Sequence, residues 1–561
     1  MSLMLEQLRQ EGFHRIDLEL AALLRRLAPV CAGPGLGLAA ALASAWRRNR
    51  HTCLPLDQVA GQDLGHAAGD WGGCAPALAE WRAQLLSSGL VSRGGPEEAP
   101  LPLVLDDHDR LYLERMHRAE GEVAAGLLSR LAPQPRPLGL EALLEELAPP
   151  DSIDDEQRQA LLAAFSRDAG ILTGGPGTGK TSTLGRLLAL ALALEPDLRL
   201  RLAAPTGKAA ARMQEALAAA LPHLPERLRA PLAALPRAST LHRLLQERPP
   251  IDWLVIDEAS MIDLPLMARV LEMLPAAARL LLIGDADQLA SVEAGAVLAE
   301  LVEGLSAADP ANGALSPVTR LRLGRRFAAG SPVGSLAEAV RMGDVESALG
   351  VLDAGSDGLR WIRPGRPGWN AELSSLLEEG SEPFRQAPDA ASALAALEGF
   401  RVVCAQRSGR LGLEGLNAWC ERRWLRPGES SRAPILVRAN DRVLGLANGD
   451  SGVLEGRPGA PGARCLLAPE GVPRDFAVAQ LPAFDTAWAI TVHQSQGSEM
   501  DEVLLILPEA PSPLLCQELL YTGLTRARER VTLLASEAAL LQAITTRAER
   551  SSGLADRLRS L

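Results

Sequence analysis

The stretch GGPGTGKTST, residues 174–183, contains Lys180, one of only two lysines in a chain of 561 residues; the other is Lys208. Every other member of the 57 basic side chains is an arginine. An arginine-rich genome explains why lysine is scarce, but it does not explain why two lysines remain. Lysine is a compact point charge on a flexible stem, whereas arginine is a wide planar fork, so the two positions indicate sites that a fork does not fit.

The pattern Gly-x4-Gly-Lys-Thr stands between an apolar run, GILTG, and a helical stretch, TLGRLLALALAL. In this setting a glycine-rich loop cradles phosphates: backbone amides surround them, Lys180 reaches the outer two, and Thr181 holds magnesium. A glycine-rich turn without a ligand is the alternative, which the preceding strand and the following helix disfavour. The sequence therefore predicts ATP and Mg2+ at a loop made of Gly174, Gly175, Pro176, Gly177, Thr178, Gly179, Lys180 and Thr181.

A second motif, VIDEAS, places Asp257 and Glu258 directly after the apolar run WLVI. Asp257 can hold the magnesium shell, and Glu258 can orient and deprotonate the attacking water. A carboxylate pair alone says little. Together with a phosphate loop earlier in the chain, the pair predicts nucleotide hydrolysis.

From residue 171 onward, short apolar runs alternate with helical stretches. This alternation predicts an α/β fold in which helices cover both faces of a parallel sheet. Ligands in such sheets bind at the carboxyl ends of the strands. Gly174 and Asp257 both follow a strand directly, as that rule requires.

Composition limits what the motifs can mean. A chain of 561 residues corresponds to about three or four domains, and 47% hydrophobic with 22% charged residues is typical of a globular protein. Neither a secretory signal nor an apolar run of about 18 residues is visible, so we expect a cytoplasmic protein with no membrane partner. Seven cysteines without a CxxC pair disfavour a zinc site and a disulfide framework. The net charge of −12 disfavours a broad nucleic-acid surface but permits a local basic channel.

Regions without a chemical motif still show organisation. Residues 1–110 contain apolar residues at helical spacing, as in LELAALLRRLA, which predicts a run of amphipathic helices. Residues 131–155 carry five prolines and an acidic end, which is typical of a boundary. A docking module is the simplest interpretation of the N-terminal region, and an additional folding domain is the alternative.

Three later stretches narrow the class of nucleotide-hydrolysing protein to which the chain could belong. GDADQLASVEAGAV, residues 284–297, follows an apolar strand and ends it with Asp285 and Gln288, polar groups able to sense a γ-phosphate. TVHQSQGSEM and LLYTGLTRARERV lie more than 190 residues further on and are polar where a plain helix or strand would not be. Arg326 and Arg526 would act as arginine fingers if a second domain closed on the nucleotide. Solvated loops and a solvated basic surface are the alternatives.

These motifs, together with Gln157, APTGKAAARM, STLHRLL, DEASMID and RRF, resemble those of superfamily 1 helicases. More narrowly, the chain resembles the RecD family of subunits of the bacterial RecBCD enzyme, exonuclease V. The likeness covers nearly the whole chain and includes the motif-poor stretches HTCLPL, RLYLERM and ANGDSGVLEG. The longer stand-alone relatives of RecD share the core, but this N-terminal region resembles the complex-bound form.

The resemblance implies an α/β fold of two RecA-like parallel-sheet motor domains, with an α-helical N-terminal domain and a small SH3-like β-barrel insertion. The implied boundaries are a helical docking domain at 1–110, a linker at 111–150, a first motor domain at 151–320, a second motor domain at 321–429 and 486–561, and the insertion at 430–485.

The resemblance also assigns roles to residues. Gln157 reads the adenine, Glu499 joins the nucleotide site, Gln288 couples the γ-phosphate to movement, and Arg326 and Arg526 reach across from the second motor domain. The implied DNA contacts are Pro205, Thr206, Lys208, Thr240, His242, Thr491, His493 and Ser495. Lys208, the second lysine, therefore falls in a DNA-facing motif. The family usually carries lysine at the position of Gln494, so we expect weaker backbone contact there.

The implied function is ATP-driven 5′ to 3′ movement along single-stranded DNA, in a heterotrimer with RecB and RecC that unwinds duplex ends. No residue pattern shows the direction of movement, and none distinguishes RNA from DNA as the track. A nuclease is disfavoured because both lysines already have roles, and the resemblance places that activity in RecB. An ATP-dependent switch or clamp loader has no need for TVHQSQGSE, and a structural subunit with a decayed motor would carry broken catalytic residues, none of which is seen.

Overall fold

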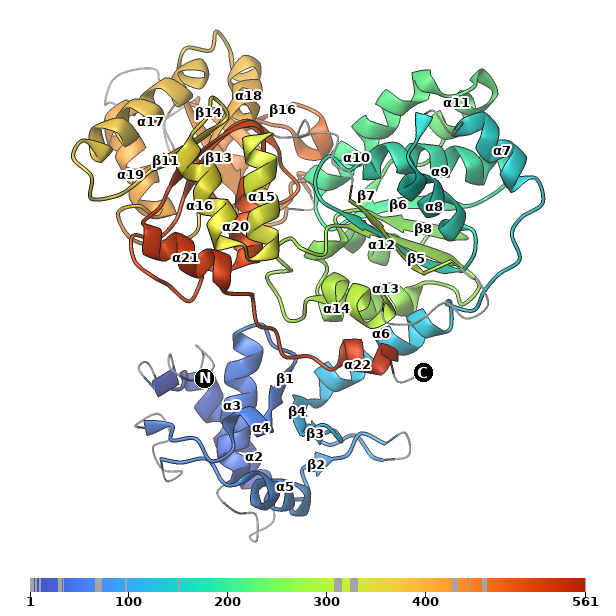
Figure 1. Cartoon of the computed structure of the whole chain (residues 1–561), viewed down its shortest axis with the longest axis vertical. Helices are drawn as coiled ribbons and strands as arrows, with labels where there is room; N and C mark the ends of the chain where they lie inside the picture. The colour runs from blue at the N-terminus through green and yellow to red at the C-terminus, as the bar shows by residue number, and fades with distance from the viewer. Residues whose placement is uncertain are drawn as a thin grey trace.

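The chain forms two α/β lobes that stand beside each other and a smaller N-terminal region below them (Figure 1). The computed structural model describes residues 5, 8–9, 12–28, 33, 35–65, 73–95, 98–149, 152–306, 315–322, 331–425, 432–441, 443–456 and 462–559. Within those residues no helix is both long and apolar enough to cross a membrane.

The first lobe is built on a six-stranded sheet in the order β10-β5-β9-β8-β6-β7, in which every neighbouring pair is parallel. The predicted parallel sheet is thereby confirmed. Its strands are β5 (Ala169–Gly174), β6 (Leu200–Ala204), β7 (Ser239–Thr240), β8 (Trp253–Ile256), β9 (Arg279–Gly284) and β10 (Val318–Leu321).

Helices cover both faces of this sheet, as the alternating pattern predicts. Successive strand residues point to opposite faces, so Leu281 packs in one core with α8 and α9, whereas Leu282 packs in the other with α13 and α14. The helices of the lobe are α8 (Asp155–Ala164), α9 (Lys180–Leu194), α10 (Gly207–Ala220), α11 (Glu226–Ala233), α12 (Leu241–Glu247), α13 (Leu264–Met273) and α14 (Val297–Ser306).

The second lobe repeats this architecture with a five-stranded parallel sheet in the order β11-β20-β19-β12-β18. Its strands are β11 (Leu359–Ile362), β12 (Phe400–Cys404), β18 (Ala489–Thr491), β19 (Met500–Ile506) and β20 (Ala527–Leu534). Its helices are α15 (Pro332–Met342), α16 (Val345–Ala354), α17 (Trp369–Arg385), α18 (Ala390–Gly399), α19 (Leu413–Trp424), α20 (Gln517–Leu524) and α21 (Glu537–Thr545).

An antiparallel sheet is inserted between β12 and β18, in the interval expected to hold a β-type insertion. Its strands pair in the order β16-β15-β14-β13-β17. They are β13 (Arg432–Val437), β14 (Ser451–Glu455), β15 (Arg464–Leu467), β16 (Arg474–Ala477) and β17 (Phe484–Thr486). Its core includes Ile435, Val453 and Phe476.

The N-terminal region differs from the predicted run of helices. It contains the helices α2 (Arg15–Leu27), α3 (Gly35–Arg48), α4 (Leu56–Val59) and α5 (Leu78–Ser87), but also a sheet in the order β1-β4-β3-β2. The strands are β1 (Cys53–Pro55), β2 (Val91–Ser92), β3 (Leu103–Leu105) and β4 (Arg110–Leu113). The prediction of a purely helical domain is therefore wrong in part, because strands of two to four residues are too short to show an alternating pattern.

The interval 111–150 is likewise not a plain linker. It forms α6 (Glu114–Leu128) and α7 (Leu140–Leu147), which pack on opposite faces of the first lobe. Val123 and Leu127 of α6 enter one core, and Leu140 and Leu144 of α7 enter the other. The prolines that suggested a boundary lie between and after these helices.

The C-terminal segment leaves the second lobe and returns to the first. Its last helix, α22 (Leu554–Arg559), lies beside α6 and α14, where Leu554 and Leu558 join the core (Figure 1). The carboxylate of Glu120, fully buried, accepts hydrogen bonds from the hydroxyls of Thr52 at 2.6 Å and Ser552 at 2.9 Å. One side chain of α6 thus joins the N-terminal region to the C-terminal segment.

We expect Glu120→Gln to lower the midpoint of chemical unfolding. An amide at this position loses charge-assisted hydrogen bonds and turns an NH2 group toward other donors, which costs about 1–3 kcal/mol. The matched control is Glu122→Gln on the same helix, because Glu122 is exposed and pairs with the exposed Arg118; we expect a loss of less than about 1 kcal/mol there. Equal losses in the two variants would contradict a structural role for the buried carboxylate.

Candidate functional site

The phosphate loop lies at the carboxyl end of β5, and α9 begins at Lys180. Gly179 caps the helix with a φ of +88°, a conformation that favours glycine. A Cβ at this position would also collide with Nε2 of Gln157. Gln157 therefore rests directly on the loop, which agrees with its predicted place in the nucleotide site.

The side chain of Lys180 bends back toward the phosphate loop that precedes it. Its Nζ donates to the backbone oxygens of Gly174 at 2.6 Å and Gly175 at 2.9 Å. Carbonyl oxygens thus hold the ammonium at the loop, where phosphate oxygens are the stronger acceptors for a cation.

Asp257 and Glu258 follow β8 at the same edge of the sheet. Glu258 has a φ of +53°, which is uncommon for a residue with a side chain. Its N–H donates to Oδ1 of Asp257 at 2.8 Å. Loss of solvent and the neighbouring Glu258 raise the pKa of Asp257, whereas Lys180 opposes that rise. Lys180 and Asp257 therefore influence each other electrostatically at this edge of the sheet.

The loop after β9 belongs to the first lobe and forms hydrogen bonds with the second. Asp285, only 2% exposed, accepts from the hydroxyl of Tyr521 at 3.1 Å and from Nε2 of Gln288 at 3.0 Å. The N–H of Leu289 donates to Oγ1 of Thr522 at 2.8 Å. Gln288 thus lies where the first lobe meets α20 of the second.

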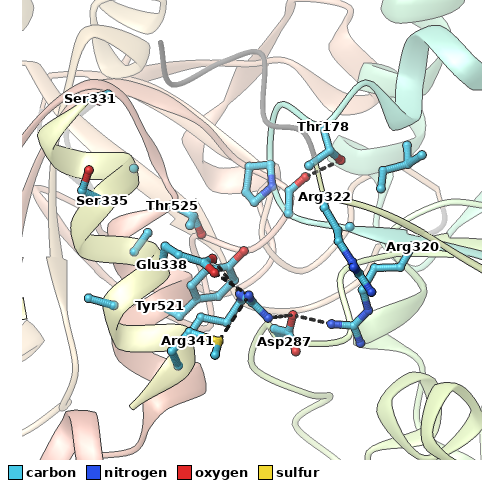
Figure 2. A pocket seen from close by; sticks show the side chains of 18 of the residues that line it. Thr178, Asp287, Arg320, Arg322, Ser331, Ser335, Glu338, Arg341, Tyr521 and Thr525 are labelled. Atoms are coloured by element: carbon cyan, nitrogen blue, oxygen red, sulfur yellow. Dashed lines mark hydrogen bonds and ion pairs between the residues drawn. The ribbon is translucent and has the colours of Figure 1, made fainter. Parts of the chain in front are cut away.

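A cavity of about 890 Å3 opens between the phosphate loop and α15 of the second lobe (Figure 2). Of the residues expected to bind nucleotide, it is lined by Gly174, Gly175, Pro176 and Thr178. Its other polar lining includes Asp287, Arg320, Arg322, Glu338, Arg341, Asp344, Tyr521 and Thr525.

Arg526 does not line this cavity in the ligand-free chain. It is 3% exposed, and its guanidinium donates to the backbone oxygens of Thr522 at 3.0 Å and Ser498 at 3.3 Å. Arg326 lies outside the described residues. Glu499 lines a different cavity of about 360 Å3, together with Lys208 and Arg212.

Lys208 stands at the N-terminal end of α10 and faces the second lobe rather than open solvent. Burial, followed by the nearby Arg212 and Arg401, lowers its pKa to about 8. The cavity that it lines is bounded by α18, by Arg401 of β12, and by Asp450, which directly precedes β14 of the inserted sheet. The second lysine therefore lies at the junction of three parts of the motor.

The remaining residues that we expect to contact DNA form two groups. Pro205, Thr206, Thr240 and His242 lie at the carboxyl ends of the neighbouring strands β6 and β7. Thr206 and Thr240 also cap helices, because they accept from the N–H groups of Ala209 and Arg243. This first group therefore lies at one edge of the first sheet.

The second group follows β18, where Thr491 and Ser495 are buried. The carboxamide oxygen of Gln494 accepts from the N–H of Thr491 at 2.9 Å, so the residue that replaces the usual lysine is held within its own turn. Nη1 of Arg50 lies 3.2 Å from Nε2 of His493. Burial, then Arg50 and Arg550, lower the pKa of His493 to about 4.

Comparison with known proteins settles the family. The description "RecBCD enzyme subunit RecD, N-terminal domain" matches residues 9–112, an AAA domain matches residues 157–294, and a UvrD-like helicase C-terminal domain matches residues 486–534. The RecBCD enzyme subunit RecD of Mycobacterium tuberculosis is 41% identical and covers 94% of this chain and 91% of its own length. The chain belongs to the RecD family. Its counterpart in Mycolicibacterium smegmatis is 40% identical over 93% of each protein.

RecD-family membership confirms the resemblance that the motifs carry, and with it the assignment to the ATP-dependent superfamily 1 helicases. A more distant relative, the ATP-dependent RecD2 DNA helicase of Deinococcus radiodurans, is 31% identical over 80% of this chain and 59% of its own length.

Several residues at the cavity were not expected from the sequence. Asp287 and Tyr521 stand inside motifs that were recognised, so their polarity was a usable signal. Arg320 and Arg341 gave no such signal in the sequence, because an arginine on a strand or on an amphipathic helix is usually a solvated residue. Their place at the cavity depends on how the two lobes meet.

A side chain at position 179 should disrupt nucleotide binding. In Gly179→Ala the Cβ meets Gln157 at a positive φ, and we expect affinity for a fluorescent ATP analogue to fall at least about tenfold. Gly121→Ala is the control, because a Cβ at Gly121 of α6 meets nothing within 4 Å. Unchanged affinity in Gly179→Ala would show that the loop does not need this contact.

His493 should make stability depend on pH. Its pKa is about 4 in the folded chain against 6.5 for the unperturbed group, so the unfolded chain binds the proton first and stability is lost as the pH falls from 6.5 toward 4. We expect wild type to lose about 2 kcal/mol more than His493→Gln between pH 7.5 and 5. Denaturant unfolding at both pH values measures the difference, with the exposed His223→Gln as control. Identical pH profiles in wild type and His493→Gln would refute the prediction.

Proposed function

We propose that the chain is an ATP-dependent 5′ to 3′ single-stranded DNA translocase and helicase, and that it acts in a RecBCD-type complex. The complex would unwind duplex ends for repair of double-strand breaks by homologous recombination and for degradation of foreign linear DNA. The observation that carries the proposal is the phosphate loop at one edge of a parallel sheet, facing a second parallel-sheet lobe across a cavity.

In this proposal the nucleotide is held mainly by the first lobe. Backbone amides of residues 174–179 surround the phosphates, Gln157 reads the adenine, and Lys180 leaves its carbonyl partners for the outer phosphates. The chemistry suits Mg2+, which takes one or two carboxylates and fills its shell with phosphate oxygens and waters. Asp257 and Thr181 would hold the ion, which would neutralise charge on the phosphates, and Glu258 would orient and deprotonate the attacking water.

Closure of the lobes would complete the site. Arg326 and Arg526 would reach the nucleotide from the second lobe, and Glu499 would join them. Arg526 is bound to backbone carbonyls of its own lobe in the ligand-free chain, so this role requires it to exchange those partners for phosphate oxygens. Gln288, beside Asp285 and Tyr521, would report the state of the γ-phosphate to the second lobe.

Movement along DNA would follow from alternating grips on the two lobes. The first lobe offers Pro205, Thr206, Lys208, Thr240 and His242, and the second offers Thr491, His493 and Ser495. Because only 3% of the residues are aromatic, phosphate contacts should dominate over base stacking and make binding sensitive to salt.

The finer architecture belongs to the same proposal. The two parallel-sheet lobes would be RecA-like motor domains with boundaries near 151–320, 321–429 and 486–561, and the inserted sheet would be an SH3-like barrel at 430–485. The N-terminal region, near 1–110, would dock on RecC, and RecB would be the third subunit and supply the nuclease. Such a complex would work in the cytoplasm.

The proposal is tested by Lys180→Gln in a reconstituted complex whose RecB motor is inactivated. We expect the variant to lose DNA-stimulated ATP hydrolysis and unwinding of duplexes with 5′ tails, because the outer phosphates lose their cation. Arg422→Gln, on the exposed face of α19, changes charge equally and should retain both activities. Unchanged hydrolysis in Lys180→Gln would refute the motor, whereas unwinding from 3′ tails alone would refute the polarity.

A further inference from the structure

An acidic residue of the first lobe holds arginines from both lobes inside the nucleotide cavity. Oδ2 of Asp287 lies 3.2 Å from Nη1 of Arg320, which belongs to its own lobe, and 3.6 Å from Nη1 of Arg341, which belongs to α15 of the second lobe. Figure 2 shows the carboxylate between the two guanidinium groups. The contact within the lobe is therefore the shorter of the two, and the contact across the cleft is the longer.

The guanidinium of Arg341 is oriented by its own helix. Nε donates to one carboxylate oxygen of Glu338 at 2.8 Å, and Nη2 donates to the other at 2.5 Å. This two-point contact fixes the plane of the fork and directs Nη1 toward the cleft. Arg341 thus keeps two of its donors on α15 whatever its third nitrogen binds.

The phosphate loop is close by. Tyr521 lies over the loop, because a Cβ on Gly175 would stand 2.8 Å from its hydroxyl. Tyr521 and Arg341 interact electrostatically, and both line the cavity with Gly175 and Thr178. Among the described residues of the second lobe, Arg341 is the arginine that lines this cavity, whereas Arg526 is held away from it.

We propose that Arg341 is a nucleotide-contacting residue of the second lobe, in addition to the two arginine fingers, and that its Nη1 moves from Asp287 to the terminal phosphate of the bound triphosphate. Glu338 is its positioning residue, and Asp287 is the partner that the terminal phosphate would replace. This inference rests on the proposed function, because it assumes that the cavity receives ATP.

Electrostatics favour the exchange. A terminal phosphate brings more negative charge and more acceptor oxygens than a single carboxylate, so it competes well for a guanidinium. Asp287 retains Arg320 after the exchange and is not left as an unpaired charge in the cleft. Because Arg341 comes from the second lobe, the new contact would draw that lobe toward the nucleotide, and loss of the terminal phosphate would return Arg341 to Asp287.

Two substitutions that break the same ion pair should act in opposite directions. Arg341→Ala removes the phosphate contact, and we expect affinity for a non-hydrolysable ATP analogue to fall about tenfold or more, with a smaller loss for ADP. Asp287→Asn removes the competitor for Arg341, and affinity for the same analogue should stay equal or rise. Arg341→Lys should recover part of the loss. If both variants weaken analogue binding alike, the pair only holds the lobes together, and the inference fails.

The matched control is Arg363→Ala. Arg363 of the second lobe is 24% exposed, against 29% for Arg341, and pairs with Asp353 outside the cavity. The Arg363→Ala variant should leave the affinities for the ATP analogue and for ADP unchanged. This inference and the proposed function can fail separately. If Arg341→Ala binds both nucleotides with wild-type affinity while Lys180→Gln is inactive, the role of Arg341 is overturned and the proposed function stands. Equal losses of ATP-analogue and ADP affinity would also overturn it, because the contact would then not be to the terminal phosphate.

Discussion

The buried carboxylate of Asp285 is the contact on which the two-lobed arrangement depends. Within its own loop it accepts hydrogen bonds from the side chain of Gln288 and the backbone N–H of Asp287, and it accepts one from Tyr521 of the other lobe. Burial raises its pKa, an effect that nearby Lys180 and its hydrogen-bond donors oppose. A buried carboxylate needs such donors, because an unsatisfied one is costly. The second lobe therefore supplies one of the donors that satisfy this buried carboxylate, at the strand end that carries the phosphate loop.

This requirement explains why nucleotide chemistry and lobe position can be coupled. Asp285 and Asp287 are two residues apart on one loop, and each is bound by a residue of the second lobe, Tyr521 and Arg341. A change of charge at the phosphate loop acts on both contacts at short range. No long pathway is needed, because the sensing loop and the moving lobe share the same side chains.

The two lysines illustrate how sequence and structure divide the explanation. The scarcity of lysine identified Lys180 and Lys208 as unusual, and the strand–loop–helix context assigned Lys180 to phosphate. The structure adds that the ammonium of Lys180 donates to two carbonyl oxygens of its own loop. Lys208 lies near Arg212 and Arg401, and no local sequence pattern predicts these neighbours.

The sequence by itself determined the parallel sheet of the first lobe, its phosphate loop, the carboxylate pair after β8 and the RecD family, because each depends on residues close together in the chain. It failed for the short strands of the N-terminal region, and for α6 and α7, whose proline-rich surroundings suggested a linker. Only the tertiary structure decided that Arg341 shares a cavity with the phosphate loop, that Arg526 is held elsewhere, and that His493 meets Arg50. The first and the last of these relations join residues more than 150 positions apart, and they arise from how two sheets and their covering helices pack, which local periodicity does not encode.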